Sequence, residues 1–205
     1  MPDLYFRSED NSGVRVLRLL SPDGTNRLTK ARVLAMIDAF QDLRQSPEPV
    51  IVTGNQEFFS AGADLQEIEA LTGVAALDFA RSGQQLMHAI RCFPAPVYAA
   101  ISGYCMGGGL DLALACHRRI AAPNAVLGHR GAALGLITGW GGTQTLPRLI
   151  GKARAQSMFV AAEKINADEA LRLGLLDAVA EDPIREAVRR IKTARAVGDS
   201  SCTDA

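Results

Sequence analysis

The first quarter of the chain combines apolar stretches of strand length with one stretch of helical spacing. Residues 14–20 are rich in Val and Leu and partly alternate, which predicts a strand that ends at the turn-forming residues 21–24 (SPDG). Thr29 is expected to cap a helix over 30–43, and the Val-Ile-Val run at 50–52 predicts a short buried strand. The apolar positions of that helix are Val33, Leu34, Ile37 and Phe40.

The remainder of the chain continues this alternation of strands and helices. One helix is expected to begin at Leu65 and a second to run to about Arg91; further helices are expected at 110–115, 167–173 and 184–196, and strands at 97–101, 119–121 and 125–127. We find no internal repeat, low-complexity tract or linker. The pattern therefore predicts one α/β domain with a mainly parallel sheet and helices packed outside it.

Composition and charge narrow the possible partners. The 205 residues suit a single domain, and the 22 basic and 22 acidic side chains cancel. No overall field would recruit nucleic acid or an anionic membrane, so neither is expected as a partner. The first ten residues lack a basic stretch followed by an apolar run, and the apolar segments are too short for a membrane span. These features predict a cytoplasmic protein.

The four cysteines, Cys92, Cys105, Cys116 and Cys202, show no CxxC pairing and no metal-ligand spacing with histidines. A zinc site is therefore not expected. The first three lie in apolar surroundings and are predicted to be core residues, whereas Cys202 lies in a polar tail and is predicted to be an exposed thiol.

Two glycine-containing segments, 61–64 (AGAD) and 106–109 (MGGG), each join an expected strand to an expected helix. Backbone N–H groups at such a helix start are unpaired and aligned with the positive end of the helix dipole. If the segments converge, one amide from each can meet a single developing oxyanion; the alternative is two ordinary tight turns. No GxSxG elbow or Walker loop is present, so neither of those chemistries is expected.

Motifs spread over nearly the whole chain resemble the crotonase (enoyl-CoA hydratase/isomerase) superfamily. They are Thr25-Asn26-Arg27-Leu28, the segment Phe59 to Leu65, Pro96-Val97, the segment Gly103 to Leu112, Gly139 to Gln144 with Leu146-Pro147-Arg148, and Ala167 to Leu175 with Val179. The resemblance implies an α/β fold of repeated β-β-α units, the ClpP-like crotonase fold, with a shortened C-terminal helical region. It places a core domain over residues 1–180 and a short C-terminal helix and disordered tail over 181–205.

The same resemblance implies roles for particular residues. The amides of Ala63 and Gly108 would bind the carbonyl oxygen of an acyl-CoA thioester. The CoA channel would be lined by Arg27, Leu28, Ala61, Asp64 and Leu65. Arg27 would meet a CoA phosphate, or would be an ordinary exposed loop arginine. No tightly bound cofactor is implied, since coenzyme A enters as part of the substrate, and the implied assembly is a homo-oligomer, a trimer or a hexamer of trimers.

Two positions depart from the glutamates that family hydratases use. The first position is Asp111, one methylene shorter, which can act in acid/base chemistry or only complement the helix dipole. The second is Gly131, which cannot move a proton. His129 faces the same side as Gly131 if the segment is extended, and its imidazole suits proton transfer; the alternative is a buried histidine hydrogen-bonded to backbone. Arg130 would face the opposite side, and His117 and His88 are predicted to be structural.

Family members also usually continue for several dozen residues as a helical region that helps to cover the CoA site and build trimers. Because the helix at 184–196 is the last one expected, the acyl pocket would be more open or closed by a neighbouring subunit, and the usual hexamer is in question.

Two hypotheses follow. The first is an enzyme that stabilises a thioester enolate, with Asp111 and His129 as proton-transfer groups. Hydration, double-bond isomerisation and decarboxylation all fit this intermediate, and the missing glutamate counts most against hydration. The second is a catalytically impaired subunit that binds a CoA thioester or acts as a scaffold. Neither hypothesis identifies the acyl group.

Overall fold

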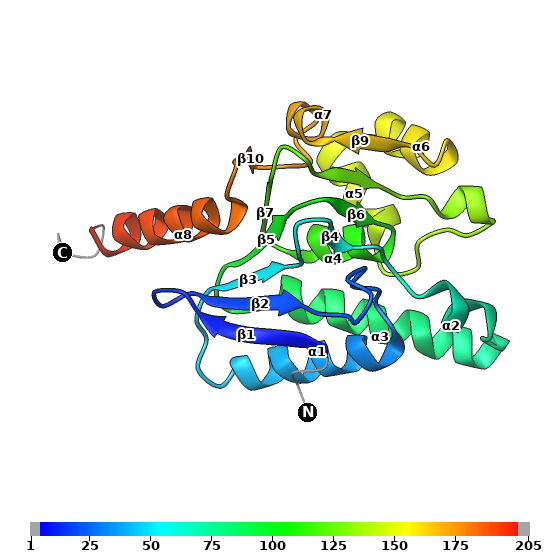
Figure 1. Ribbon diagram of the computed structural model, residues 1–205, viewed down its shortest axis with the longest axis horizontal. Helices are drawn as coiled ribbons and strands as arrows, with labels where there is room; N and C mark the ends of the chain where they lie inside the picture. Colours follow the sequence, from blue (N-terminus) through cyan, green and yellow to red (C-terminus); the bar gives the residue numbers. More distant parts are fainter. Residues whose placement is uncertain (1–4, 201–205) are drawn as a thin grey trace.

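The strands expected near residues 15, 50 and 97 form the centre of a six-stranded sheet in the computed structural model, which describes residues 5–200 (Figure 1). The strand order is β1 (Phe6–Asp10), β2 (Arg15–Leu19), β3 (Val50–Thr53), β5 (Val97–Ile101), β7 (Arg118–Ala121) and β10 (Ala178–Val179). Only the pairing of β1 with β2 is antiparallel; the other neighbours are parallel. The prediction of a mainly parallel sheet is confirmed for this part of the structure.

A second sheet, of four strands, was not predicted from the hydrophobic pattern, although one of its strands, Val126–Gly128, was expected at 125–127. Its order is β4 (Phe58–Ser60), β6 (Tyr104–Met106), β8 (Val126–Gly128) and β9 (Lys164–Asn166), with β9 antiparallel to β8. Each of β3, β5 and β7 is followed in the chain by one strand of this sheet and then by helical structure. These are the repeated β-β-α units that the resemblance implied, so the fold class is confirmed.

The helices include every one that the sequence predicted. They are α1 (Lys30–Leu43), α2 (Leu65–Glu69), α3 (Gly73–Arg91), α4 (Gly108–Ala115), the 3₁₀ helix η2 (Gly131–Leu134), α5 (Gly142–Ile150), α6 (Lys152–Val160), α7 (Ala167–Arg172) and α8 (Pro183–Ser200). Thr29 caps α1 as expected, with its Oγ1 accepting from the Arg32 N–H at 3.2 Å. None of the helices in the described part of the chain combines the length and apolar character needed to cross a membrane.

Alternating strand residues divide the core between the two faces of the larger sheet. In β3, Val50 and Val52 join a large cluster with α1, α3 and α4, whereas Ile51 joins a smaller cluster on the opposite face. Figure 1 shows α1 and α3 along one face of the sheet. Ala187 and Ile191 of α8 are buried in the smaller cluster, so α8 covers the other face.

Two details of the predicted core are wrong. Leu34 of α1 is 43% exposed, and the buried stripe uses Met36 instead. Cys92 is exposed because it lies just after α3 ends, whereas Cys105 and Cys116 are buried as expected. Cys202 and the tail 201–205 lie outside the described residues, and the division at residue 180 stays a prediction.

Candidate active site

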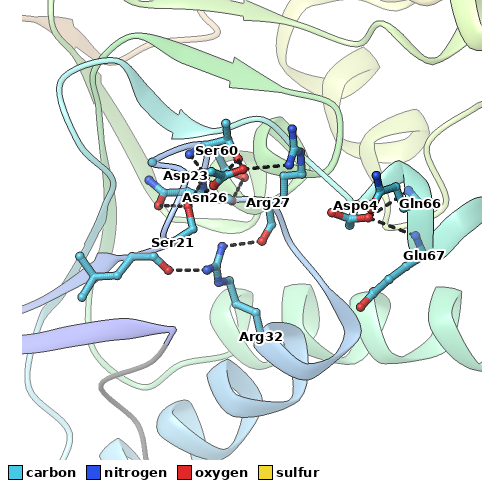
Figure 2. Close-up of polar contacts among 12 residues, drawn as sticks. Ser21, Asp23, Asn26, Arg27, Arg32, Ser60, Asp64, Gln66 and Glu67 are labelled. Carbon is cyan, nitrogen blue, oxygen red and sulfur yellow. Dashed lines mark hydrogen bonds and ion pairs between the residues drawn. The ribbon is translucent and has the colours of Figure 1, made fainter.

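The loop between β2 and α1 is fastened to β4 by side-chain hydrogen bonds (Figure 2). Asn26 is fully buried, and its Nδ2 donates to the Phe58 carbonyl at 3.0 Å, while the Ser60 hydroxyl donates to the Asn26 carbonyl at 2.7 Å. The Leu28 N–H then donates to the Gly62 carbonyl at 2.8 Å. This network fixes the segment that follows β4, including Ala63.

The two glycine-containing segments converge, as the sequence suggested. Gly62 has a φ of +94°, and a Cβ there would lie 2.6 Å from the Met106 carbonyl oxygen and 3.0 Å from the Gly108 nitrogen, so only glycine allows this close approach. A Cβ at Gly108 would lie 3.2 Å from the Ala63 nitrogen. Among the described residues, neither the Ala63 nor the Gly108 N–H has a hydrogen-bond acceptor. The pair is therefore available to an oxygen of a ligand.

Both segments open onto a cavity of about 440 Å³. Its walls come from the segment after β4, from α3, α4, η2 and the end of α6. Most lining side chains are apolar, among them Ile68, Phe79, Leu136, Ile137, Trp140, Phe159 and Val160. Ile137 and Val160 are 71% and 73% exposed, so the rim of the cavity is both apolar and open. Such a cavity suits an apolar group with a few polar contacts at one end.

Asp111 lies on the first turn of α4, three residues after Gly108, and lines this cavity. Its side chain is only 1% exposed. The Thr138 hydroxyl donates to Oδ2, whereas Oδ1 has no hydrogen-bond partner. Burial raises the pKa of Asp111 from 3.8 to about 7, and the Thr138 hydroxyl and the nearby Gly142 amide limit that rise. The carboxyl group can therefore both take up and release a proton near neutral pH.

His129 follows β8 and lines the same cavity, with its Nε2 3.5 Å from Asp111 Oδ1. That distance is too long for a good hydrogen bond, and Nε2 has no other partner. Burial lowers the pKa of His129 from 6.5 to about 4, so the imidazole is neutral at pH 7. Its ring packs on Phe159, with the centroids 5.0 Å apart.

The extended conformation expected for residues 129–131 is not present. The chain does not stay extended after β8, because Arg130 turns with φ −93° and ψ 7° into η2. His129 and Gly131 nevertheless both line the cavity. Arg130, expected on the opposite side, lines it too and is exposed.

The residues implied for the CoA channel separate into two groups. Ala61 and Leu65 line the cavity. Figure 2 shows the Arg27 guanidinium turned towards Asp23 and Asp64 turned towards α2. The Arg27 Nη1 lies 2.9 Å from Asp23 Oδ2.

Asp64 and Leu28 have structural roles in the absence of a ligand. Asp64 accepts from the Gln66 N–H at 2.9 Å and caps α2. Leu28 is fully buried and pairs through its backbone with the strand segment at Ala63. Of these five residues, only Ala61 and Leu65 therefore line the cavity, and Arg27 is paired with Asp23.

The other histidines lie away from this cavity. The His117 Nδ1 accepts from the Val97 N–H at 2.8 Å, which agrees with the structural role predicted for it. His88 is exposed on α3. Within residues 5–200 there is no group of three or more His, Cys, Asp or Glu side chains that could hold a metal ion.

Sequence reasoning missed Thr138, Trp140 and Gly142 as parts of the site. Trp140 is buried, and its indole packs so closely on Gly83 of α3 and Gly108 of α4 that a Cβ at either position would collide with it. A Cβ at Gly142 would lie 2.1 Å from Asp111 Oδ1. The one available signal was the polar Thr138 within the otherwise apolar and glycine-rich segment 134–142.

The free energy of unfolding is expected to fall less with rising pH in Asp111→Asn than in wild type. The folded state keeps its Asp111 proton where the unfolded chain has released it, so it binds more protons between about pH 4 and about pH 7. The free energy of unfolding therefore falls as pH rises through this window, by about 4 kcal/mol in total for a pKa raised from 3.8 to about 7. His129 acts in the opposite sense, since its lowered pKa costs stability as pH falls from 6.5 to about 4.

Urea unfolding at about pH 5, 7 and 8 measures this effect. The free energy of unfolding of Asp111→Asn minus that of wild type should increase by about 2–3 kcal/mol from pH 5 to pH 8. Asp38→Asn, at an exposed carboxylate on α1, is the matched control and should follow wild type. Parallel curves for wild type and Asp111→Asn would contradict the raised pKa.

Comparisons with known proteins identify the family. A family model described as enoyl-CoA hydratase/isomerase matches residues 9–197. The crotonyl-CoA hydratase of Syntrophomonas wolfei subsp. wolfei is 39% identical over 176 residues, 84% of this chain and 68% of that protein. A probable enoyl-CoA hydratase of Bacillus subtilis (strain 168) is 48% identical over 134 residues, 65% of this chain and 52% of that protein.

The solved structures agree. A structure of Pseudomonas aeruginosa DspI superposes with a TM-score of 0.88 at 33% identity, covering 93% of this chain and 80% of that one. The crotonase resemblance of the sequence is confirmed, and the chain belongs to the enoyl-CoA hydratase/isomerase family.

Proposed function

We propose that this protein is an enzyme that acts on an acyl-CoA thioester through an enolate. The Ala63 and Gly108 N–H groups would hold the thioester oxygen, and Asp111 would transfer the proton. Asp111 takes the carbon-bound proton of the thioester as a base and returns a proton to a carbon as an acid, while the negative charge rests on the oxygen between the two amides. His129 would stay neutral beside Asp111.

One observation carries this proposal. Two amides without acceptors and a buried carboxyl group with a pKa of about 7 face the same apolar cavity. Aligned donors in a water-poor site stabilise a developing oxyanion strongly, and a carboxyl with a pKa near neutrality is suited to proton transfer in both directions. The relatives named crotonyl-CoA hydratase and probable enoyl-CoA hydratase support a CoA thioester as the substrate.

The CoA part of the substrate would pass Ala61 and Leu65, with coenzyme A present only as part of the thioester. Arg27 would have to exchange Asp23 for a CoA phosphate, which is feasible because this ion pair is half exposed and contributes little stability. The exposed apolar rim at Ile137 and Val160 supports the prediction of a homo-oligomer in which a neighbouring subunit covers the cavity.

The single carboxyl group favours some reactions over others. Isomerisation needs one group that moves a proton between two carbons, and decarboxylation needs only a proton donor, whereas hydration also needs an activated water. Asp111 is the only carboxylic acid among the described residues that line the cavity. Double-bond isomerisation or decarboxylation is therefore the preferred reaction class, ahead of hydration.

Gly131→Glu is expected not to restore a second catalytic carboxylate. A Cβ at Gly131 would lie 2.6 Å from the Leu136 carbonyl oxygen, and the Leu136 N–H donates to the Gly131 carbonyl at 2.8 Å across the same turn. The backbone would have to move, so we expect a loss of about 1–3 kcal/mol in stability and no gain in crotonyl-CoA hydration. Thermal unfolding and a hydration assay check this, and a large gain in hydration would contradict it.

The alternative is a catalytically impaired subunit that binds a CoA thioester or acts as a scaffold, which the absence of a side chain at Gly131 favours. The deciding experiment is turnover of the purified protein with crotonyl-CoA, a 3-enoyl-CoA and methylmalonyl-CoA, followed by mass spectrometry, with CoA binding measured by calorimetry in parallel. Turnover of any of the three supports the enzyme and identifies its reaction class. Thioester binding without turnover would support the scaffold.

A further inference from the structure

The two oxygens of the Asp111 carboxyl group lie in different surroundings. Oδ2 accepts a hydrogen bond from the hydroxyl of Thr138, a half-buried residue between η2 and α5. Oδ1 is buried without a hydrogen-bond partner, 3.5 Å from His129 Nε2. The Gly142 backbone packs against Oδ1, where any Cβ would lie 2.1 Å from this oxygen, and its nearby amide also limits the pKa of the carboxyl group.

We propose that Thr138 is a positioning residue that holds Oδ2 as an acceptor and so assigns proton exchange with the substrate to Oδ1. The inference rests on the function proposed for Asp111. In that step the Oδ1 lone pair takes the carbon-bound proton, and the carbon–hydrogen bonding pair becomes the enolate, whose charge moves to the thioester oxygen. Return of the same proton from Oδ1 to a carbon of the substrate regenerates the carboxylate.

The Thr138 hydrogen bond restricts the rotation of the Asp111 carboxyl group and determines which of its oxygens carries the proton. The terminal torsion of an aspartate is broad, so packing alone does not choose which oxygen faces the cavity. A hydroxyl that donates to one oxygen favours the proton on the other when the group is protonated. A donor to the carboxylate also stabilises the charged form, so the Thr138 hydroxyl keeps the pKa of Asp111 below the value that burial alone would give.

The other titratable groups around Asp111 do not change charge near neutral pH. His129, after β8, is neutral because burial lowers its pKa to about 4. The Cys105 thiol on β6 is neutral because burial raises its pKa. A titration observed near pH 7 in this cluster therefore reports on Asp111.

The test compares Thr138→Val, which keeps the shape and removes the hydroxyl, with Thr138→Ser, which keeps the hydroxyl. Thr138→Val should lower kcat by about 10–100-fold, raise the apparent pKa of the pH–rate profile and leave KM nearly unchanged. Thr138→Ser should retain most of the wild-type kcat and its pH profile. Thr193→Val, which removes an exposed hydroxyl on α8 far from the cavity, is the control and should behave as wild type.

A second readout does not depend on turnover. The carboxyl carbon of Asp111, assigned by its loss in Asp111→Asn, should titrate at higher pH in Thr138→Val than in wild type or Thr138→Ser by carbon-13 NMR. Unchanged titration and unchanged kcat in Thr138→Val would overturn the inference, and so would an equal loss in Thr138→Ser, because the hydroxyl would then not be the cause. A protein without turnover in any form would overturn the proposed function, while the NMR titration would still decide the role of Thr138.

Discussion

Asp111→Asn is expected to lower turnover of the preferred acyl-CoA by about 10²–10⁴-fold while leaving thioester binding close to that of wild type. Asparagine has the same shape, and its carbonyl oxygen can still accept from the Thr138 hydroxyl, so the fold of the site should persist. It cannot take up or release the proton, however, and no other carboxylic acid among the described residues lines the cavity. The substitution therefore removes the chemistry and leaves the binding surface in place.

Steady-state kinetics and calorimetric binding of a CoA thioester measure the two quantities separately. Asp38→Asn makes the same chemical change on the exposed face of α1 and should alter neither. Full turnover in Asp111→Asn would exclude Asp111 as the proton-transfer group and direct attention to His129. A parallel loss of binding would mean that the carboxyl group holds the substrate and does not only act on it.

The helices and the central strands could be predicted because their signals are local. α1, with apolar residues at helical spacing, was predicted at its observed bounds over 14 residues, whereas for the 19-residue α3 only the end near Arg91 was predicted. β3 and β5 are short apolar runs next to prolines, which is typical of buried parallel strands. Helical periodicity indicates which side of a helix is buried but not how far around the helix the buried residues extend. Leu34 was wrongly included for this reason.

The second sheet could not be predicted because three of its strands carry almost no local signal, and only β8 was expected as a strand, at 125–127. β4, β6, β8 and β9 have three residues each, too few to show alternation. What holds them is pairing between segments far apart in the chain, such as Phe58 with Tyr104 and Leu127 with Ile165. Only the family resemblance implied a β-β-α repeat and, with it, a second strand after each strand of the larger sheet.

The parts of the candidate site that lie in or beside glycine-rich turns could be predicted from the sequence, and the other parts could not. Ala63, Gly108 and Asp111 lie in or beside such turns, so their neighbourhood could be expected from the sequence. Thr138 contacts Asp111 across 27 positions of chain, through a segment without regular periodicity. Its contribution depends on tertiary packing around Trp140 and Gly142, which no local pattern describes.

Gly108→Ala is expected to lower turnover by about 10²–10³-fold by blocking the space between the two amides. The added methyl carbon would lie 3.2 Å from the Ala63 nitrogen and 2.5 Å from Trp140 Cζ3. Trp140 is buried against Phe79, with ring centroids 5.2 Å apart, so it has little room to retreat. A thioester oxygen could then no longer reach both N–H groups.

Two measurements separate this effect from simple misfolding. Kinetics should show the loss in kcat/KM, and infrared spectroscopy with a carbon-13-labelled thioester carbonyl should show that the lowered stretching frequency of the bound carbonyl returns towards its value in solution. Gly73→Ala adds the same methyl group at the start of α3, where nothing lies within 4 Å, and should change neither readout. The infrared readout applies equally to an enzyme and to a thioester-binding scaffold, so an unchanged carbonyl frequency in Gly108→Ala would exclude this pair of amides as the oxyanion hole under either hypothesis.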